Sequence, residues 1–242
     1  MLPRYKMAKT NLQGKPIYFI DSASFVFMYD EIFKKEIYKF TPSSLKPRII
    51  DCGANIGLSV IYFKKNFPGC RITAFEPDEL AYSVLERNVE NFCFKNVELV
   101  KKAVWVSDEY LEFMSEGADG GRVVETSSES FEKYKVKAER LRNHLEEPVD
   151  FLKIDIEGAE TEVVQDCKDL LHNVGNLFIE YHSFVNRPQT IHTLTAILFE
   201  AGFRVHIHPP VMSPHPFLER IAYMGMDMQL NIFAFRDNYE VP

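Results

Sequence analysis

Residues 48–59 read RIIDCGANIGLS, and this stretch decides the fold of the chain. The apolar pair Ile49–Ile50 is typical of a short buried strand, which ends at Asp51. Gly53 and Gly57 then bracket a turn, and an apolar helical pattern follows. A strand, a glycine turn and a helix in this order place backbone N–H groups beside the end of a sheet, where they can meet a ligand.

The composition of this turn favours a cationic ligand. The glycine spacing is G-x-x-x-G, which lacks the third glycine of dinucleotide sites. We expect glycine here because a Cβ would block a close ligand. Asp51 would repel an anion and suits a ligand with ammonium and sulfonium groups, as in S-adenosylmethionine. Asp51, Gly53, Gly57 and Ser59 are therefore candidate residues of a site for this cofactor, and the alternative is a plain tight turn.

Composition narrows the class of protein. The chain has 242 residues, of which 46% are hydrophobic, enough for one sizeable core. A net charge of −7, without a run of five Lys or Arg residues, disfavours a nucleic-acid partner. The four cysteines form no C-x-x-C pair, and neither a signal peptide nor a membrane-length apolar run appears. We therefore expect a cytoplasmic protein without an integral membrane segment; no pattern predicts its oligomeric state.

The chain divides into an N-terminal extension, residues 1–47, and a catalytic domain, residues 48–242. The extension is expected to hold a strand at 17–20 and a helix from Ser22 or Ser24 to about Phe40, packed on the domain. The domain alternates strands with helices, which predicts an α/β fold with a mostly parallel sheet and helices on both faces. Its expected main strands are 49–51, 71–75, 97–105, 149–156, 177–182, 205–207 and 230–235, the last two forming an antiparallel pair.

Further elements are expected between these strands. Helices are predicted after the glycine turn to residue 67, from the Asp78 cap to residue 92, from 159 to the C-cap Gly175, and over 191–201. Added strands are predicted at 111–114 and 122–126, an exposed polar segment at 127–135 and a short helix at 141–145. The Met- and Pro-rich segment 208–228 is expected to form a lid or acceptor wall. Its apolar side chains are Met212, Phe217, Tyr223, Met224, Met226 and Met228.

Polar residues at the strand ends mark the expected site, because ligands of such sheets bind beyond the carboxyl ends of the strands. Glu76, followed by Pro77 in FEPDE, lies about twenty residues after the glycine turn, as a ribose-binding carboxylate does. The alternative is that Glu76 only caps the next helix, a role that Asp78 can fill. Ala103, near the end of the third strand, suits an adenine ring and equally suits packing.

Two further strand ends carry charged residues. Lys153, Asp155 and Glu157 alternate with apolar residues, and three charges in an apolar strand are costly to bury without partners. A functional site is favoured here, with a structural ion pair as the alternative. Glu180 and His182 share one side of the next strand. Oxygen-rich strand ends suit Mg²⁺, here through Asp155 and Glu157, but no second Asp/Asn pair follows. The sequence therefore predicts no metal.

The stretches DCGANIGLS, FEPDE, VDFLKIDIEGAE and FIEYHSF, in this order and spacing, resemble the FkbM family of S-adenosylmethionine-dependent methyltransferases. The resemblance implies the class I methyltransferase fold, Rossmann-like, with a seven-stranded sheet of order 3-2-1-4-5-7-6 and an antiparallel last strand. It implies methyl transfer, usually to oxygen, on sugar or glycan hydroxyls and natural products. Asp51, Gly53, Asn55, Gly57 and Glu76 match its cofactor positions. Positions that face the reacting centre are matched by Lys153, Asp155, Glu157, Glu180 and His182.

The expected reaction is O-methylation, with a base that removes the proton of the acceptor hydroxyl. His182 is the first choice because its ordinary pKa lies near neutrality, and Asp155 is the second. Glu180 would orient His182, and Lys153 would hold Asp155. Three alternatives remain: N-methylation of an amine, which would survive loss of His182; a nicotinamide-dependent oxidoreductase; and a non-catalytic binding protein.

Overall fold

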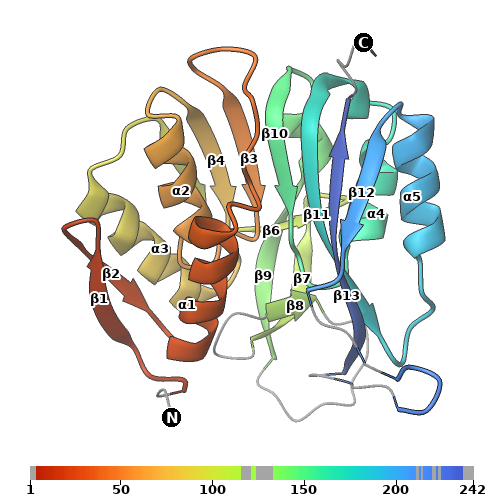
Figure 1. Ribbon diagram of the computed structural model, residues 1–242, viewed down its shortest axis with the longest axis horizontal. Helices are drawn as coiled ribbons and strands as arrows, with labels where there is room; N and C mark the ends of the chain where they lie inside the picture. The colour runs from red at the N-terminus through yellow and green to blue at the C-terminus, as the bar shows by residue number, and fades with distance from the viewer. Residues whose placement is uncertain are drawn as a thin grey trace.

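A seven-stranded sheet forms the centre of the computed structural model, which describes residues 4–115, 121–123, 133–210, 213, 215–219, 222 and 225–236 (Figure 1). The strand order is β12-β13-β11-β10-β3-β4-β5, and only β13 runs antiparallel to its neighbours. Counted along the chain, this is the predicted order 3-2-1-4-5-7-6. The bounds are β3 Arg48–Cys52, β4 Arg71–Phe75, β5 Val97–Val100, β10 Val149–Ile154, β11 Val174–Phe184, β12 Arg204–His208 and β13 Met226–Phe235.

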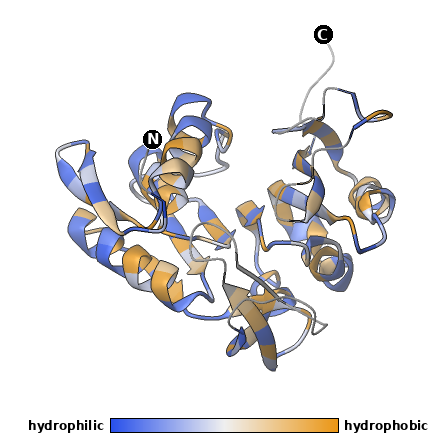
Figure 2. Cartoon of the chain, turned by 90° about the horizontal axis from the view of Figure 1, so that it is seen from below, coloured by the Kyte–Doolittle hydropathy of each residue, from blue (hydrophilic) through white to orange (hydrophobic). Residues whose placement is uncertain are grey.

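Helices cover both faces of this sheet, α2 and α3 on one and α4 and α5 on the other. Successive strand residues point to opposite faces, so Ile49 joins the core beneath α2 and α3 while Ile50 joins the core beneath α4 and α5. No described helix is long and apolar enough to span a bilayer, and Figure 2 shows the helices carrying both hydrophobic and hydrophilic residues. The helices are α2 Leu58–Asn66, α3 Glu79–Phe92, α4 Glu160–Cys167 and α5 Ile191–Glu200.

The N-terminal residues form a hairpin and a helix on the α2/α3 face. Strands β1 (Ala8–Leu12) and β2 (Lys15–Phe19) pair antiparallel, and α1 (Ser22–Tyr29) continues into a π-helical turn, Asp30–Lys34. The predicted cap and end of this helix are wrong. Asp21 caps it by accepting from the backbone N–H groups of Ala23 and Ser24, and the left-handed φ of +51° at Glu36 takes the chain out of the helix. The division at residue 47 stays a prediction.

A smaller sheet lies below the main one in the order β6-β9-β7-β8. It corrects the single strand expected over 97–105, because the Lys102 N–H bonds back to the Val100 carbonyl, and the chain leaves the main sheet there. Strand β9 begins at Lys133, where an exposed segment was expected; residues 124–132 lie outside the described part. The bounds are β6 Ala103–Trp105, β7 Tyr110–Ser115, β8 Gly121–Val123 and β9 Lys133–Arg140.

Two short 3₁₀ turns complete the fold. One, Leu141–His144, occupies the place of the predicted short helix. The other, Leu171–Asn173, follows α4, which ends at Cys167. The predicted C-cap Gly175 is therefore wrong. It lies inside β11, where a Cβ would come within 3.3 Å of the Asp150 carbonyl oxygen.

Candidate active site

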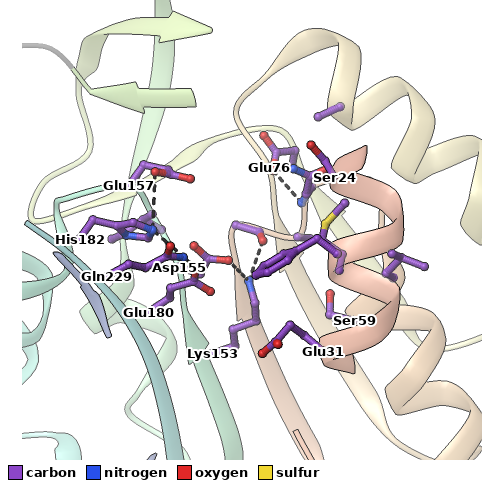
Figure 3. A pocket seen from close by; sticks show the side chains of 18 of the residues that line it. Ser24, Glu31, Ser59, Glu76, Lys153, Asp155, Glu157, Glu180, His182 and Gln229 are labelled. Atoms are coloured by element: carbon purple, nitrogen blue, oxygen red, sulfur yellow. Dashed lines mark hydrogen bonds and ion pairs between the residues drawn. The ribbon is translucent and has the colours of Figure 1, made fainter. Parts of the chain in front are cut away.

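A cavity of about 510 Å³ opens at the carboxyl ends of the central strands (Figure 3). Its walls are the glycine turn after β3, the loops after β4 and β10, the ends of β11 and β13, and α1. The predicted site residues that line it are Gly53, Asn55, Ser59, Glu76, Pro77, Ala103, Lys153, Asp155, Glu157, Glu180 and His182. Asp51 and Gly57 are absent from this lining.

Asp51 is fully buried beneath the cavity and compensated by protein groups. It accepts a 2.5 Å hydrogen bond from Ser59 Oγ, and its Oδ1 lies 3.4 Å from Lys153 Nζ. Burial alone would lower the pKa of Lys153, but Asp155, whose Oδ2 is 3.1 Å away, and Asp51 raise it well above its ordinary value. Asp51 is absent from the cavity lining, so any effect of Asp51 on a cationic ligand would act through its charge alone and stays a prediction.

The two glycines of the turn are needed for packing against protein. A Cβ on Gly53 would lie 1.8 Å from the Asp155 carbonyl oxygen, and a Cβ on Gly57 would lie 2.6 Å from Leu85 Cδ1. Both glycines also have left-handed φ values, +85° and +86°. We expected glycine at these positions because a ligand would leave no room for a Cβ. The structure shows instead that Asp155, just after β10, and Leu85 of α3 occupy that space. Lys153 Nζ donates to the Gly53 carbonyl at 2.8 Å and fixes the turn further.

Glu76 presents a buried carboxylate to the cavity. Its Oε2 accepts from the Asn55 N–H at 2.8 Å, and its Oε1 accepts from the Asp78 N–H at 2.9 Å. Burial raises the pKa of Glu76 to about 7, although both backbone N–H groups act in the opposite direction. Asp78 caps α3, as predicted, by accepting from the backbone N–H groups of its first turn. The ribose role of Glu76 stays a prediction.

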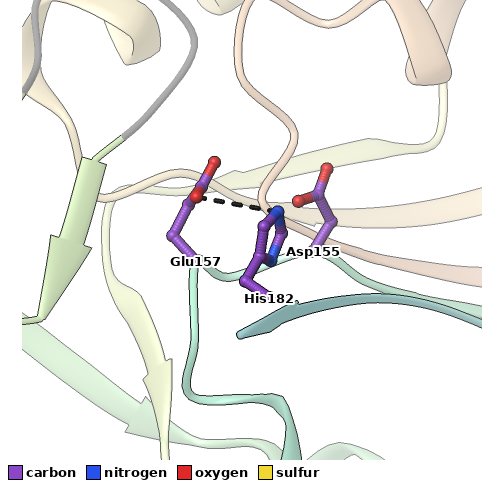
Figure 4. A group of neighbouring side chains, drawn as sticks. All are labelled: Asp155, Glu157 and His182. Carbon is purple, nitrogen blue, oxygen red and sulfur yellow. Dashed lines mark ion pairs between the residues drawn. The ribbon is translucent and has the colours of Figure 1, made fainter. Parts of the chain in front are cut away.

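His182 lies in a group of carboxylates at the opposite side of the cavity (Figure 4). Its Nδ1 is 2.9 Å from Glu160 Oε1, and its Nε2 is 3.7 Å from Glu157 Oε2 and 3.6 Å from Glu180 Oε1. Burial alone would lower the pKa of His182, but Glu157 and Glu160 raise it well above its ordinary value. This direction runs against the near-neutral pKa on which the choice of His182 as the base rests, and the role of His182 stays a prediction.

Several site residues escaped sequence reasoning. Glu160 ends the KIDIEGAE stretch but was not singled out as a partner of His182. On β13, Gln229 Nε2 donates to Glu180, and Asn231 also lines the cavity. These last two lie far from any motif, and only the antiparallel pairing of β13 with β11 brings them in.

Helix α1 forms a wall of the cavity through Ser24, Phe27, Met28 and Glu31. The sequence reading assigned this helix to packing. A signal was available, because SASFVFMY is apolar on all sides, whereas a helix packed on one face alternates with polar residues. From 208–228, Pro210, Ser213, Met226 and Met228 line the cavity, whereas Phe217 is fully exposed. Met212, Tyr223 and Met224 lie outside the described residues.

Comparison with known proteins identifies the family. The model of the methyltransferase FkbM domain matches residues 51–205. Methyltransferase sdnD of Sordaria araneosa is 30% identical over 225 residues, which cover 78% of this chain and 85% of that protein. Methyltransferase 1 of Beauveria bassiana (strain ARSEF 2860) is 24% identical over 213 aligned residues. The alignment covers 78% of this chain and 84% of that protein.

Solved structures share the fold. Methyltransferase FkbM from Methylobacillus flagellatus KT superposes with a TM-score of 0.53 at 15% identity, covering 84% of this chain but only 46% of that protein. M. jannaschii TYW2, solved in complex with AdoMet, superposes with a TM-score of 0.52 at 14% identity. The superposition covers 97% of this chain and 87% of that one. These likenesses confirm the class I methyltransferase fold. Together with the match over residues 51–205, they lead to one conclusion: the chain belongs to the FkbM family of methyltransferases.

Proposed function

We propose that this chain is an S-adenosylmethionine-dependent O-methyltransferase that acts on a hydroxyl of a sugar, glycan or natural product. One observation carries the proposal: a single cavity joins a glycine turn and a buried carboxylate, Glu76, to a second group of carboxylates around Asp155. The first side suits a nucleoside, and the second suits a group that must lose a proton. A methyltransferase that acts on hydroxyls needs a nucleoside-binding side and a proton-accepting side in the same cavity.

The residues of the first side fit the donor. Two backbone N–H groups orient the Glu76 carboxylate, and its oxygens keep lone pairs for two ribose hydroxyls. Pro77 and Ala103 line the same part and offer apolar surface to a purine. When bound here, S-adenosylmethionine supplies an electrophilic methyl group on a sulfonium.

Asp155 is the preferred base. It lines the cavity, its side chain is 25% exposed, and Lys153 holds its Oδ2 at 3.1 Å. Transfer forms a bond from the acceptor oxygen to the methyl carbon while the carbon–sulfur electrons go to sulfur, and the hydroxyl proton goes to Asp155. A positioned base of this kind accelerates transfer by about 10²–10⁴-fold. His182 then acts through its contacts with Glu157 and Glu180.

The wall formed by α1 suits an amphipathic acceptor. Phe27 and Met28 offer apolar surface, whereas Ser24 and Glu31 offer hydrogen-bonding groups. Phe27 lines the cavity and is 46% exposed, so its ring is accessible to a ligand. A hydroxylated molecule with one apolar face matches this mixture.

The test is a labelled transfer. Purified protein and methyl-¹³C-labelled S-adenosylmethionine are incubated with extracts of cells that lack the protein, and the products are analysed by mass spectrometry and NMR. We expect a labelled methyl group on oxygen in a product that is absent from boiled-enzyme controls. Labelled methyl on nitrogen would overturn the hydroxyl assignment. Binding of NAD in preference to S-adenosylhomocysteine would overturn the whole proposal.

A further inference from the structure

Three side chains converge on one point of the cavity. Asp155 and Glu157 from the loop after β10, and His182 from β11, each place one ligand atom so that all three lie within 4.8 Å of one another (Figure 4). His182 Nε2 is 3.7 Å from Glu157 Oε2. Ligand atoms bound at roughly 2.0–2.3 Å from one cation lie about 3–4.6 Å apart. Small side-chain movements would therefore bring these three atoms into one coordination sphere.

The imidazole is held as a metal-binding histidine is held. Its Nδ1 is 2.9 Å from Glu160 Oε1, and the Glu160 side chain is only 1% exposed. Histidines that bind metals characteristically direct one nitrogen to the ion and the other N–H to a carboxylate. Glu160 thus fixes the ring so that Nε2 faces Glu157 and Glu180.

A separate observation shows that the protein leaves this side of the cavity incomplete. Asn231 lines the cavity and is 4% exposed, yet its Oδ1 receives no hydrogen bond from the part of the chain that the structure describes. Asn231 pairs with Glu180 across β13 and β11, so both side chains lie on the same side of the sheet. A buried acceptor without a donor calls for a ligand or a water held by one.

The carboxylates around His182 also favour a bound cation. Asp155, Glu157, Glu160 and Glu180 surround His182, while Lys153 is shared between Asp51 and Asp155. Among the described residues, Lys153 pairs with Asp155 but with none of the three glutamates, so a bound cation would supply positive charge beside Glu157 and Glu180.

We propose that Asp155, Glu157 and His182 bind a divalent transition-metal ion such as Mn²⁺. Carboxylate oxygens suit Mn²⁺ and Mg²⁺, and the imidazole favours the transition metal. The sequence predicted no metal because no second Asp/Asn pair follows Asp155 and Glu157, but the fold brings His182 to these two carboxylates. The catalytic role rests on the proposed function: a cation here would hold the acceptor hydroxyl and lower its pKa.

The test is Mn²⁺ titration of the chelator-treated full chain, followed by electron paramagnetic resonance. We expect one site in the native protein, with at least tenfold weaker binding in Glu157→Gln and in His182→Asn. Glu160→Gln, which alters the support of the ring and of the Gly158 N–H without removing a proposed ligand, should weaken binding about tenfold. The matched control is His206→Asn/His208→Asn, because these two Nε2 atoms lie 2.8 Å apart on the exposed edge strand and offer another place for the ion. The control should bind like the native protein.

Two results would overturn the proposal: no specific Mn²⁺ site in the folded native protein, or a site that disappears in the His206/His208 variant and persists in Glu157→Gln. Calorimetry with S-adenosylhomocysteine in the chelator separates this from the proposed function. Cofactor binding without a cation site would refute the cation alone. If the native protein does not bind S-adenosylhomocysteine, the result contradicts the proposed methyltransferase function, whatever the Mn²⁺ titration gives.

Discussion

Gly53 and Asp155 meet so closely that a Cβ on the glycine would lie 1.8 Å from the aspartate carbonyl oxygen. The Asp155 N–H also donates to the Cys52 carbonyl at 3.1 Å, immediately before the glycine. The glycine turn and the carboxylate loop are therefore joined through the backbone. This contact fixes how far the donor side of the cavity lies from the side that would receive the acceptor.

Gly53→Ala should destabilise the protein more than Gly14→Ala. The two glycines have nearly equal φ values, +85° and +84°, so backbone strain of about 1–2 kcal/mol is common to both variants. Only Gly53 has a backbone atom in the way, since nothing lies within 4 Å of a Cβ on Gly14. Urea denaturation should show a loss of about 3 kcal/mol or more for Gly53→Ala. Equal losses would contradict the close packing described here.

Lys153→Met should cost about 3–5 kcal/mol of unfolding free energy, because it leaves Asp51 buried without a counter-charge. The double variant Asp51→Asn/Lys153→Met removes that charge and should recover part of the loss. Chemical denaturation of the two variants measures both quantities. If the double variant is as unstable as the single one, the Asp51 charge is not what Lys153 compensates.

Glu76→Gln should weaken binding of S-adenosylhomocysteine by about 10–100-fold, since Gln keeps one acceptor oxygen and loses one charge-assisted hydrogen bond, which contributes about 1.5–3 kcal/mol. Only the ionised carboxylate accepts from both ribose hydroxyls. Because the pKa of Glu76 is raised to about 7, native affinity should fall as the pH drops through 7 and level off above it. Calorimetry on both sides of pH 7 checks this, with the exposed neighbour Glu79→Gln as control. A pH-independent native affinity would refute the ribose assignment.

Phe27→Ala should raise the KM for the acceptor and leave cofactor affinity unchanged, because Phe27 lines the cavity on α1. Its partial exposure means that stability should change little. The adjacent Val26, also exposed but absent from the cavity lining, provides the control Val26→Ala. Steady-state kinetics with the identified acceptor gives both KM values. Equal KM values for Phe27→Ala and Val26→Ala would contradict a role of Phe27 in acceptor binding.

Local patterns predicted the class of the fold. The alternation of strands and helices from Arg48 predicted a mostly parallel sheet with helices on both faces, and the family resemblance implied its strand order. Most of the site residues named from the strand ends line the cavity. Errors arose where one residue redirected the chain. The tight turn at Lys102 moved β6 into another sheet, and the left-handed Glu36 shortened the first helix.

The remaining errors concern contacts between distant segments. Nothing near Gly53 in the sequence indicates that Asp155 will occupy the space of its Cβ. Likewise the pKa of His182 depends on Glu157 and Glu160, which lie in a segment about twenty residues before His182 and meet it only in the folded chain. Residue types and spacing locate such a group, but its protonation follows from distances that only the folded chain sets.

The most direct test of the methyl-transfer account is a comparison of Asp155→Asn with the native protein in turnover and in affinity for S-adenosylhomocysteine. The amide keeps the shape of the side chain beside Lys153 but cannot accept the hydroxyl proton. We predict that turnover falls by about 10²–10⁴-fold while cofactor affinity stays close to native. Near-native turnover on a hydroxyl acceptor would contradict the account.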